Sequence, residues 1–517
     1  MDKICLFLSG KGKNMFKKIL VANRGEIAIR VIRACKELRV KTVAVYSETD
    51  TESLHVQYAD ECYCIGPAEP TRSYLNIGKI IELAKKSECE AIHPGYGFLS
   101  QIPTFAKACE ENGIEFIGPP SRVLQKTGCK VEARKIAVKA GVPIIPGSIE
   151  PAKTMDEAME VAEKVGYPVL VKAVYGGGGK GMRIVMNENE MQRTLELAAS
   201  EAESSFGSRE IYVEKFLPRV RHIEFQVLAD KTGKVIHLGE RECSIQRRYQ
   251  KLIEETPSPF MTKELRKEMG KAAVKIAKAV NYVNAGTVEF LVDRDKNYYF
   301  LEMNTRLQVE HLITEMVTGI DIVKAQIKIA GGQKLEYKQS DIAMRGHAIN
   351  CRINAEDPYN NFMPSPGTVT KFQLPGGPGV RVDTHLYSGY SISVFYDPLI
   401  VKLAVWGSNR DEAIQRMKNA LNEFVIESVK TTIPFHKKIM EDEYYLKGDI
   451  HINFVEERIG EVLPKRALED EEAAAIVAVL AEQIERRGVR AVIPRREPRA
   501  VSLWRLAGRT RRQGRTF

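Results

Sequence analysis

The sequence predicts an α/β protein whose chain opens with a parallel sheet, and three features indicate this. Short β-branched segments alternate with helical patterns over about the first 130 residues, as in βαβ units around a parallel sheet. A strand, a glycine-rich loop and a second strand follow at 167–185, and an acidic hairpin comes at 287–304. With 517 residues the chain is long enough for about three domains, each able to bury a core of its own.

The first module is predicted to be an open α/β domain. Its expected strands are KKILVAN (17–23), TVAVYS (42–47), AIHPG (91–95) and EFIG (115–118). Between the first two strands, apolar residues recur at helical spacing from Glu26 to Leu38. The preceding residues hold an apolar run of only five, shorter than the core of a signal peptide, so we expect the folded chain to start at Met15.

The second module is predicted to begin with a helix over Val131–Ala140, which Gly141 ends. Its further expected strands and helix are Ile211–Phe216, Ile223–Leu228, Val235–Gly239, Lys263–Val280 (the helix), Thr287–Asp293 and Tyr298–Asn304. A third module, at about 346–454, mixes short strands with Pro/Gly turns. Residues 471–485 form an alanine-rich helical patch, and the composition of 486–517 predicts disorder.

The net charge of +10 is confined to the end of the chain. Residues 486–517 contain eleven Arg and one Glu, so the other 485 residues sum to zero. A neutral body carries no electrostatic surface for nucleic acid, so we expect no nucleic-acid partner for the folded part.

No apolar run approaches the ~20 residues that a membrane span needs, so no membrane segment is expected. The nine cysteines are scattered and form no CxxC pair, which favours a reducing cytoplasm. Cys62 and Cys64 form a CxC without a nearby His, and we interpret them as small buried residues rather than zinc ligands.

The hairpin at 287–304 places two acids together. If Asp293 pairs with Tyr298 across the turn, Glu289 lies opposite Glu302. Opposed side chains are ~4.5–5.5 Å apart, where two carboxylates repel each other. A divalent cation between them removes the conflict, and oxygen ligands that leave positions for phosphate are those that Mg²⁺ takes.

Polar residues alternate beyond this hairpin. A strand period of two puts Glu302, Asn304, Arg306, Gln308 and Glu310 on one face. An edge strand with a solvated face is the plain alternative for any one of these residues. The whole alternation, placed after an acidic pair, favours the floor of an active site.

The loop Gly176–Gly179 can bring backbone N–H groups close to phosphate, because glycine carries no side chain that blocks the approach. It is not a Walker loop, since Val174 and Gly181 stand where that motif needs Gly and Ser/Thr. A flexible hairpin tip is the alternative. Four basic residues could neutralise phosphate and bicarbonate as a set, although each alone is typical of a surface charge: Lys130, Lys172, Lys251 and Arg352.

Several long motifs together resemble the biotin carboxylase family. They are KILVANRGEIAIRVIRACKEL (18–38), IHPGYGFLS (92–100), GGGGKGM (176–182), CSIQRR (243–248), EMNTRLQVEH (302–311) and RINAEDP (352–358). The similarity runs from about Met15 to about Gly460. It implies an ATP-grasp fold with a Rossmann-like N-terminal (pre-ATP-grasp) domain and an α+β C-terminal domain. The implied boundaries are 1–14 (extension), 15–129 (N-terminal domain), 130–332 (ATP-grasp domain, lid at about 144–218), 346–455 (C-terminal domain), 456–485 (helical extension) and 486–517 (basic tail).

The resemblance also implies a role for each motif residue. The residues implied to hold ATP are Lys130, Lys172, Gly178, Gly179, Glu214, Lys215, Phe216, Leu217 and His222. Those implied to hold Mg²⁺ or Mn²⁺ are Glu289, Glu302 and Asn304, and those around bicarbonate are Lys251, Arg306, Gln308 and Val309. Glu310 is implied to be the base that deprotonates bicarbonate, and Arg352 to stabilise the biotin enolate, with Tyr96 and Asp397 in motifs near that pocket.

The chain departs from the family pattern at three places. Tyr249 stands where the family often has His, and a phenol does not titrate near neutrality, which puts that nucleotide contact in doubt. Gln101-Ile102-Pro103 replaces the usual Glu-Asn after FLS, with Pro103 at an expected helix start, and Leu312 replaces the usual Pro after VEH. Neither of these two changes removes a catalytic group.

No biotinyl-lysine motif such as Ala-Met-Lys-Met occurs, so biotin is expected on a separate chain. The expected partner is a biotin carboxyl carrier protein or a biotinylated carboxyltransferase subunit, and the family commonly forms homodimers. The resemblance favours a two-subunit pyruvate carboxylase mildly, but the acceptor, pyruvate or an acyl-CoA, stays open.

Two alternatives remain. One is another ATP-grasp carboxylate-amine ligase, such as a carbamoyl-phosphate or peptide-type ligase, which IHPGYGF and RINAEDP disfavour. The other is a non-catalytic nucleotide-binding regulator, or an RNA binder that acts through the Arg-rich tail. The intact set of Glu289, Glu302, Arg306, Glu310 and Arg352 speaks against it.

Overall fold

The structure is a computed structural model, and it describes residues 15–152, 154–173, 182–206, 209–463, 475–480 and 482. The chain divides into a unit of Met1–Leu463 and a unit of Pro464–Phe517. In the second unit residues 475–480 are helical, which confirms the predicted helix for those residues, while the tail at 486–517 lies outside the described part. None of the described helices has the length and apolarity that crossing a membrane requires.

The first unit begins with the predicted parallel sheet. Its order is β3-β2-β1-β4-β5, and every pairing is parallel. The strands are β1 (Lys18–Val21), β2 (Lys41–Tyr46), β3 (Glu61–Cys64), β4 (Ala91–His93) and β5 (Glu115–Phe116). Four of the five were predicted, and β3 was missed. The interpretation of Cys62 and Cys64 as buried is wrong, because both are exposed on this edge strand.

Helix α1 (Gly25–Glu37) follows β1, where one was predicted. It begins at Gly25, whose φ of +64° is accessible to glycine without strain. Its Ile27, Val31 and Ile32 are at most 2% exposed and join a core that also contains residues far along the chain. The other helices here are α2 (Leu54–Tyr58), α3 (Ile77–Lys86), α4 (Pro103–Glu111, with the proline in its first turn as expected) and α5 (Ser121–Gly128), with 3-10 turns at Glu48–Asp50 and Pro70–Arg72.

A small three-stranded sheet of order β7-β6-β8 comes next. Its strands are β6 (Val169–Ala173), β7 (Met182–Val185) and β8 (Ile211–Lys215), as predicted. Helices α7 (Met155–Val165) and α8 (Glu188–Phe206) pack against it, whereas α6 (Lys130–Lys139) packs against β13 (Tyr298–Asn304) and α9 (Lys263–Ala279). These strands and α7 and α8 share a separate apolar core, and the glycine loop at 174–181 lies outside the described residues.

The main sheet has eight antiparallel strands in the order β13-β12-β9-β10-β11-β14-β21-β19. They are β9 (Arg221–Ala229), β10 (Val235–Arg247), β11 (Gln250–Thr256), β12 (Asn284–Val292), β13 (Tyr298–Asn304), β14 (His347–Asn354), β19 (Val380–Thr384) and β21 (Leu399–Gly407). The sheet crosses the expected boundary between the second and third modules, because β11 pairs with β14. Ile245, Leu252 and Ile253 therefore pack in the same apolar cluster as Ile349 and Leu403 of the third module.

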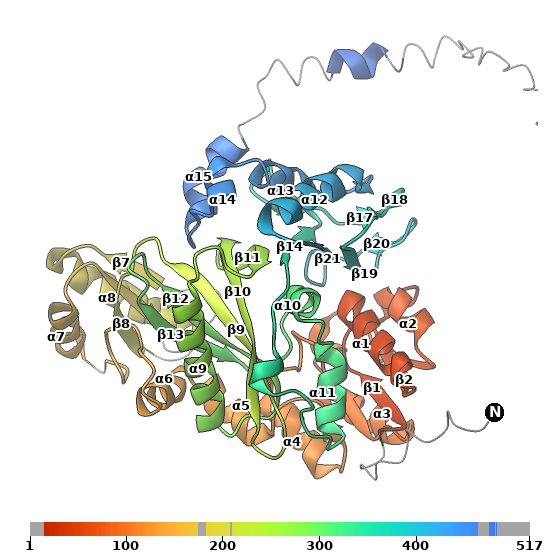
Figure 1. The fold of residues 1–517 in the computed structure, drawn as a ribbon, viewed down its shortest axis with the longest axis horizontal. Coiled ribbons are helices and arrows are strands. Elements are labelled where there is room, and N and C mark those ends of the chain that lie inside the picture. The colour runs from red at the N-terminus through yellow and green to blue at the C-terminus, as the bar shows by residue number, and fades with distance from the viewer. Residues whose placement is uncertain are drawn as a thin grey trace, which may run out of the picture. The chain divides into compact units, whose positions relative to one another are not determined.

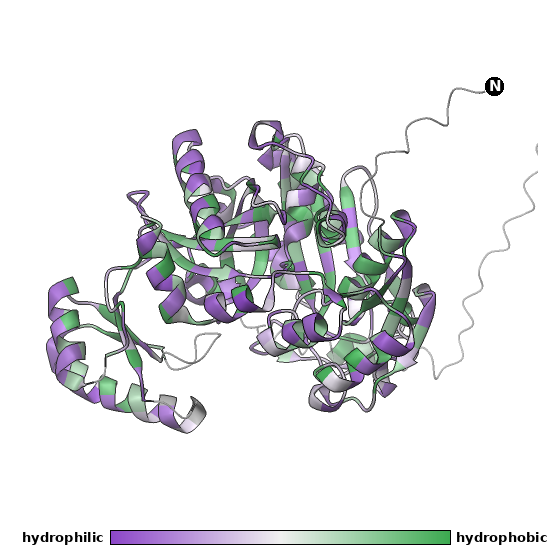
Figure 2. Ribbon diagram, turned by 90° about the horizontal axis from the view of Figure 1, so that it is seen from below, coloured by the Kyte–Doolittle hydropathy of each residue, from purple (hydrophilic) through white to green (hydrophobic). Residues whose placement is uncertain are grey.

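Helices cover both ends of this sheet. They are α9 (Lys263–Ala279), α10 (His311–Thr318), α11 (Ile322–Ala330), α12 (Arg410–Glu423), α13 (Ile433–Ile439), α14 (Glu443–Lys447) and α15 (Phe454–Val462). The short elements are β15 (Glu356–Asp357), β16 (Met363–Pro364), β17 (Gly367–Thr368), β18 (Phe372–Gln373), β20 (Ser391–Ile392), β22 (Val425–Ile426) and a 3-10 turn at Gln339–Asp341. Figure 1 shows the C-terminal helices on the end of the sheet opposite α9 and α5, and in Figure 2 the helices carry both hydrophilic and hydrophobic stretches.

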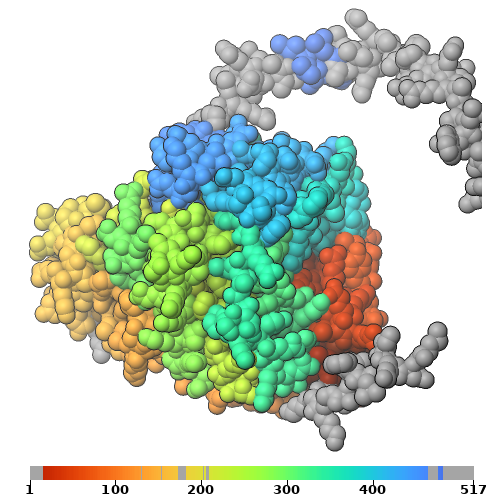
Figure 3. Space-filling view, viewed as in Figure 1, coloured from red at the N-terminus to blue at the C-terminus, as the bar shows by residue number. Residues whose placement is uncertain are grey.

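The N-terminal module also contacts the C-terminal part of the same unit directly. Tyr396 donates its hydroxyl to Ser47 Oγ at 2.7 Å, and the hydroxyls of Tyr390 and Ser53 lie 3.2 Å apart. In Figure 3 the red and the cyan parts of the chain meet along one continuous surface. Three segments distant in sequence therefore enclose the space described next.

Candidate active site

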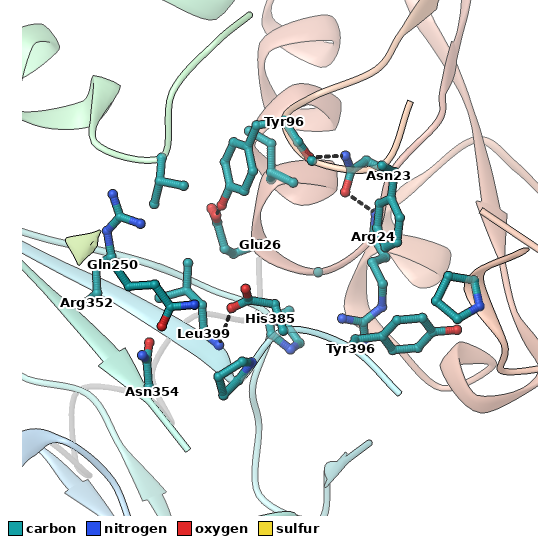
Figure 4. Close-up of a pocket in the computed structure, with 18 of the residues that line it drawn as sticks. Asn23, Arg24, Glu26, Tyr96, Gln250, Arg352, Asn354, His385, Tyr396 and Leu399 are labelled. Atoms are coloured by element: carbon teal, nitrogen blue, oxygen red, sulfur yellow. Dashed lines mark hydrogen bonds between the residues drawn. The ribbon is translucent and has the colours of Figure 1, made fainter. Parts of the chain in front are cut away.

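A cavity of about 500 Å³ lies where these three segments meet. Glu26 and Tyr96 reach it from the N-terminal module, Lys251 and Arg306 from the middle of the chain, and Arg352 from β14. Figure 4 shows Tyr96 directed toward Glu26 on one side and Arg352 beside Gln250 on the other. Sequence reasoning predicted a site at Lys251, Arg306 and Arg352, and the structure brings these three together.

The predicted opposition of Glu289 and Glu302 is confirmed, but the assumed register at the turn is wrong. Val292, not Asp293, pairs with Tyr298, and the register shifts by one residue between Glu289 and Phe290. This bulge returns Glu289 to a position opposite Glu302. The two carboxylates therefore project from one face of the hairpin.

The predicted strand does not continue through residue 310. β13 ends at Asn304, and α10 begins at His311. The intervening loop still turns Gln308 and Glu310 toward the hairpin: Gln308 donates Nε2 to Glu289 Oε1 at 2.8 Å. Residues of the predicted row do lie close together, but a loop rather than a strand period of two brings them there.

Lys251, on β11, is the centre of the charged cluster. Its Nζ lies 2.5 Å from Glu224 Oε2, 2.9 Å from Glu289 Oε1 and 2.7 Å from Glu310 Oε1. Burial alone would lower the pKa of Lys251, but the carboxylates of Glu224, Glu289 and Glu310 outweigh it and hold that pKa well above its usual value. Lys251 is therefore a permanent cation at the cavity.

Arg352 joins Glu310 to a further buried acid. Its Nε donates to Glu254 Oε1 at 2.6 Å and its NH2 to Glu310 Oε2 at 2.9 Å. Glu310 is thus held between Lys251 and Arg352 while only 2% exposed. Burial favours its neutral form, but the two cations outweigh burial and hold the pKa of Glu310 below its ordinary range. The carboxylate stays ionised and can accept a proton.

Arg241 and Glu224, two buried residues that sequence reasoning missed, support this cluster. Arg241, which is fully buried, donates Nε to Glu224 Oε1 at 2.5 Å and NH1 to Gln226 Oε1 at 2.8 Å. Its NH2 also reaches Gln308 Oε1 at 3.5 Å. A hydrophobic pattern does not predict buried charges on a central strand, so it could not find these two residues. Their place in the sequence next to the motifs was the only sign of them.

The predicted metal ligands lie together. Asn304 Nδ2 is 2.9 Å from Glu289 Oε1 and 3.4 Å from Glu302 Oε1, so the three side chains converge. Glu289 is buried, whereas Glu302 is exposed. Two carboxylates and an amide are hard oxygen donors, which fits Mg²⁺ or Mn²⁺ with positions left for phosphate. His222 adds a nitrogen 3.1 Å from Glu289 Oε2, and His222, Glu224 and Glu289 also have ligand atoms close enough to share one ion.

Of the residues expected to hold ATP, some lie in contact with one another and others do not, and two lie outside the described residues. Lys172 Nζ lies 2.5 Å from Glu214 Oε2, and Arg134 binds the same carboxylate. Lys215 instead donates to the carbonyls of Gly166 and Tyr167 at 2.9 and 3.0 Å. Phe216 and Leu217 follow β8 and are partly exposed. Lys130 is the first residue of α6, and Gly178 and Gly179 lie outside the described residues.

Tyr96 and Glu26 form a second group at the cavity that the motifs did not assign together. Tyr96 donates its hydroxyl to Glu26 Oε1, and Lys402 Nζ, fully buried, lies 2.8 Å from Glu26 Oε2. Burial, opposed by Lys402, raises the pKa of Glu26 to about 7. Lys402 also donates to the carbonyl of Val309 at 3.4 Å, and Val309 lines the cavity.

Sequence models of three domain families match the chain. They are the N-terminal domain of biotin carboxylase over residues 15–124, the ATP-binding domain of the carbamoyl-phosphate synthase L chain over 129–338, and the C-terminal domain of biotin carboxylase over 350–457. The N-terminal and C-terminal matches are both to biotin carboxylase domains. They therefore favour biotin carboxylase over the alternative of a carbamoyl-phosphate or peptide-type ligase.

Relatives match over most of their length. The chain is 57% identical over 443 residues to a pyruvate carboxylase subunit of Methanothermobacter thermautotrophicus, covering 86% of this chain and 90% of that protein. It is 54% identical to biotin carboxylase 1 of Bacillus subtilis, with coverage of 86% and 98%. The 2-oxoglutarate carboxylase small subunit of Hydrogenobacter thermophilus is 52% identical, with coverage of 86% and 94%.

Solved structures agree. The biotin carboxylase domain dimer of Hydrogenobacter thermophilus 2-oxoglutarate carboxylase, in complex with MgADP, ADP and bicarbonate, has a TM-score of 0.83 at 50% identity and covers 87% of this chain and 99% of that one. Campylobacter jejuni biotin carboxylase, in a β-γ-ATP complex, has a TM-score of 0.83 at 46% identity, with coverage of 86% and 99%.

Proposed function

Because the chain belongs to the biotin carboxylase family and is a ligase that carboxylates biotin with ATP and bicarbonate, we propose how its residues divide that reaction. The observation that carries the proposal is the position of Glu310 between Lys251 and Arg352 in the cavity.

The nucleotide lies, in this proposal, along the three-stranded sheet and the acidic hairpin. Lys130, Lys172, Gly178, Gly179, Glu214, Lys215, Phe216, Leu217 and His222 bind ATP. Glu289, Glu302 and Asn304 hold Mg²⁺ or Mn²⁺, and their convergence on one face of the hairpin supports this. The metal, when bound, neutralises phosphate charge and orients the γ-phosphate for transfer.

Bicarbonate binds beside Lys251, Arg306, Gln308 and Val309, and Glu310 takes its proton. The dianion then attacks the γ-phosphate, so that a P–O bond forms to carboxyphosphate and ADP leaves. The pKa of Glu310, which Lys251 and Arg352 hold low, keeps the base ionised near neutral pH. Lys251 and Arg306 offset the charge that appears on bicarbonate, since removal of its second proton is unfavourable without cations nearby.

Arg352 serves the second step. Carboxyphosphate breaks down to carbon dioxide and phosphate, and the released phosphate takes the proton from the ureido nitrogen of biotin. The resulting enolate then attacks the carbon dioxide through that nitrogen, so that an N–C bond forms. Arg352 faces the same cavity as Tyr96 and cannot lose its charge by deprotonation, which suits it to stabilise that enolate. Glu254 accepts a hydrogen bond from Arg352 Nε at 2.6 Å and so holds the guanidinium in place.

The biotin is carried by another chain, either a carrier protein or a biotinylated carboxyltransferase subunit. We infer a homodimer, supported by the dimeric relative at 50% identity.

The eight cysteines of the described part form no disulfide, which supports a cytoplasmic location. Relatives more than 50% identical are named for pyruvate and for 2-oxoglutarate, so the acceptor is set by the carboxyltransferase partner.

We propose the domain boundaries at 15–129, 130–332 (with a lid at about 144–218) and 346–455, followed by a helical extension and the basic tail. The matched ranges of the three family models support the first three. The pairing of β11 with β14 means that the last two domains share one sheet.

Transfer of carbon-14 from bicarbonate to free biotin, with and without ATP, tests the function. Glu310→Gln should still bind ATP but lose most carboxylation, because the amide cannot accept the proton. Arg352→Ala should slow biotin carboxylation more than bicarbonate-dependent ATP cleavage. Wild-type turnover in Glu310→Gln would refute the base, and equal losses in Arg352→Ala would refute its separate role.

A further inference from the structure

Arg306 differs from the other cations of the cavity in its partners. Arg24 is paired with Asp50 at 2.6 Å, Lys251 with three carboxylates and Arg352 with two. Arg306, in contrast, forms no ion pair with any residue that the structure describes. Its Nε donates to Gln101 Oε1 at 2.8 Å, and its NH1 to the carbonyl of Leu307 at 3.1 Å. Within the described part of the chain, both hydrogen bonds of the Arg306 guanidinium therefore go to neutral acceptors.

Gln101 comes from a distant part of the chain. It lies two residues before α4, in the N-terminal module, whereas Arg306 follows β13. Its amide nitrogen donates to Thr305 Oγ1 at 3.4 Å while its amide oxygen accepts from Arg306. The orientation of the amide is fixed by chemistry, because the Nε of arginine only donates. One side chain thus holds two successive residues of the loop that enters the cavity.

A carboxylate in this place would act differently. It could accept from Arg306 Nε as well as an amide does, but it could not donate to Thr305. It would also form an ion pair with Arg306 and offset the guanidinium charge that the cavity would otherwise present to an anion. Gln101 stands where the family motif usually has Glu. This chain therefore carries a neutral side chain at the position whose oxygen accepts the hydrogen bond from Arg306 Nε.

We propose that Gln101 is a positioning residue that orients Arg306 without neutralising it, and so strengthens the binding of bicarbonate. This inference rests on the proposed function, in which Arg306 faces bicarbonate. The neutral amide fixes the direction of the guanidinium and leaves its charge uncompensated. A carboxylate would fix the direction and also offset the charge. Gln101 itself is not among the residues that line the cavity, so it acts through Arg306.

Two variants of the full chain separate these properties. Gln101→Glu keeps the acceptor for Arg306 and adds a charge, so the KM for bicarbonate should rise about tenfold, with a much smaller fall in kcat and no change in the KM for ATP. Gln101→Met keeps the size of the side chain but removes the acceptor, so kcat should fall as well. Thermal unfolding of both variants serves as the control for folding.

A structural role alone would lower the unfolding temperature and kcat without a selective effect on bicarbonate. An unchanged KM for bicarbonate in Gln101→Glu, or an equal rise in the KM for ATP, would overturn the proposal. Line broadening of carbon-13 bicarbonate in the presence of MgADP provides a readout without turnover. If bicarbonate broadens with the wild type and broadens less with Gln101→Glu, the inference about Gln101 is supported. This holds even if the wild type carboxylates no biotin, because that result would count against the proposed function alone.

Discussion

Arg241→Met removes a fully buried cation from the charged cluster. Arg241 and Glu224 are both 0% exposed, and their ion pair of 2.5 Å is accompanied by hydrogen bonds from Arg241 to Gln226, Thr287 and Thr314 at 2.8 to 3.2 Å. Removal of one partner of a buried pair costs about 3–5 kcal/mol, because the other charge is left in a medium of low polarity. Met fills much of the same volume, so the loss reflects charge and hydrogen bonds rather than a cavity.

This free energy converts to a change in melting temperature. Unfolding entropy of about 2.1 cal/mol/K per residue gives about 1 kcal/mol/K for the 463-residue unit, so the midpoint should fall by about 3–5 °C if the unit unfolds in one step. Calorimetry measures this change. Bicarbonate-dependent ATP cleavage should fall about tenfold, because Glu224 and Gln308 lose the hydrogen bonds from Arg241 and position Lys251 less accurately.

The double variant Arg241→Met/Glu224→Gln is the matched control. It removes both charges of the pair, so part of the lost stability should return, with a coupling of about 1–3 kcal/mol in the double-mutant cycle. A melting temperature within 1 °C of the wild type in Arg241→Met, or a double variant less stable than the sum of the single changes, would refute the reasoning.

Two further predictions concern buried acids whose pKa values move in opposite directions. Burial opposes ionisation of Glu255, but Arg410 at 2.7 Å and His347 at 2.7 Å outweigh it and lower its pKa to about 2 from 4.5. A depressed pKa contributes stability that is present above pH 4.5 and lost as the pH falls to 2, so the advantage of the wild type over Glu255→Gln should shrink by about 3 kcal/mol across that window in urea denaturation. A pH-independent difference would contradict the pairing. The pKa of Glu26, raised to about 7, has the opposite sign: the folded state binds the extra proton, so the wild type should lose stability relative to Glu26→Gln as the pH rises from 4.5 to 7. The same urea denaturation series measures this difference in the free energy of unfolding between wild type and Glu26→Gln. A difference that stays constant, or that moves in favour of the wild type as the pH rises, would count against a raised pKa of Glu26.

The acidic hairpin shows what local sequence can predict. Alternation and turn chemistry placed β12 and β13 correctly and opposed Glu289 to Glu302. The register at the turn was wrong by one residue, and the bulge that corrects it leaves no mark in an alternating pattern. Likewise, the parallel sheet followed from four apolar segments, whereas β3 was missed because its exposed cysteines lack the apolar signal of a buried strand.

The partners of the catalytic groups could not be predicted in the same way, because they depend on pairings between distant strands. Lys251 lies on β11, Arg352 on β14 and Glu310 in the loop before α10, and β11 pairs with β14 over Ile253–Cys351 and its neighbours. Only this pairing brings Glu254 beside Arg352 and Glu310 between two cations. Because the sheet is continuous across the expected domain boundary, a shift of β14 by one residue would turn Arg352 to the opposite face. The low pKa of Glu310 therefore depends on the register of a strand pair whose members are about 100 residues apart in the sequence.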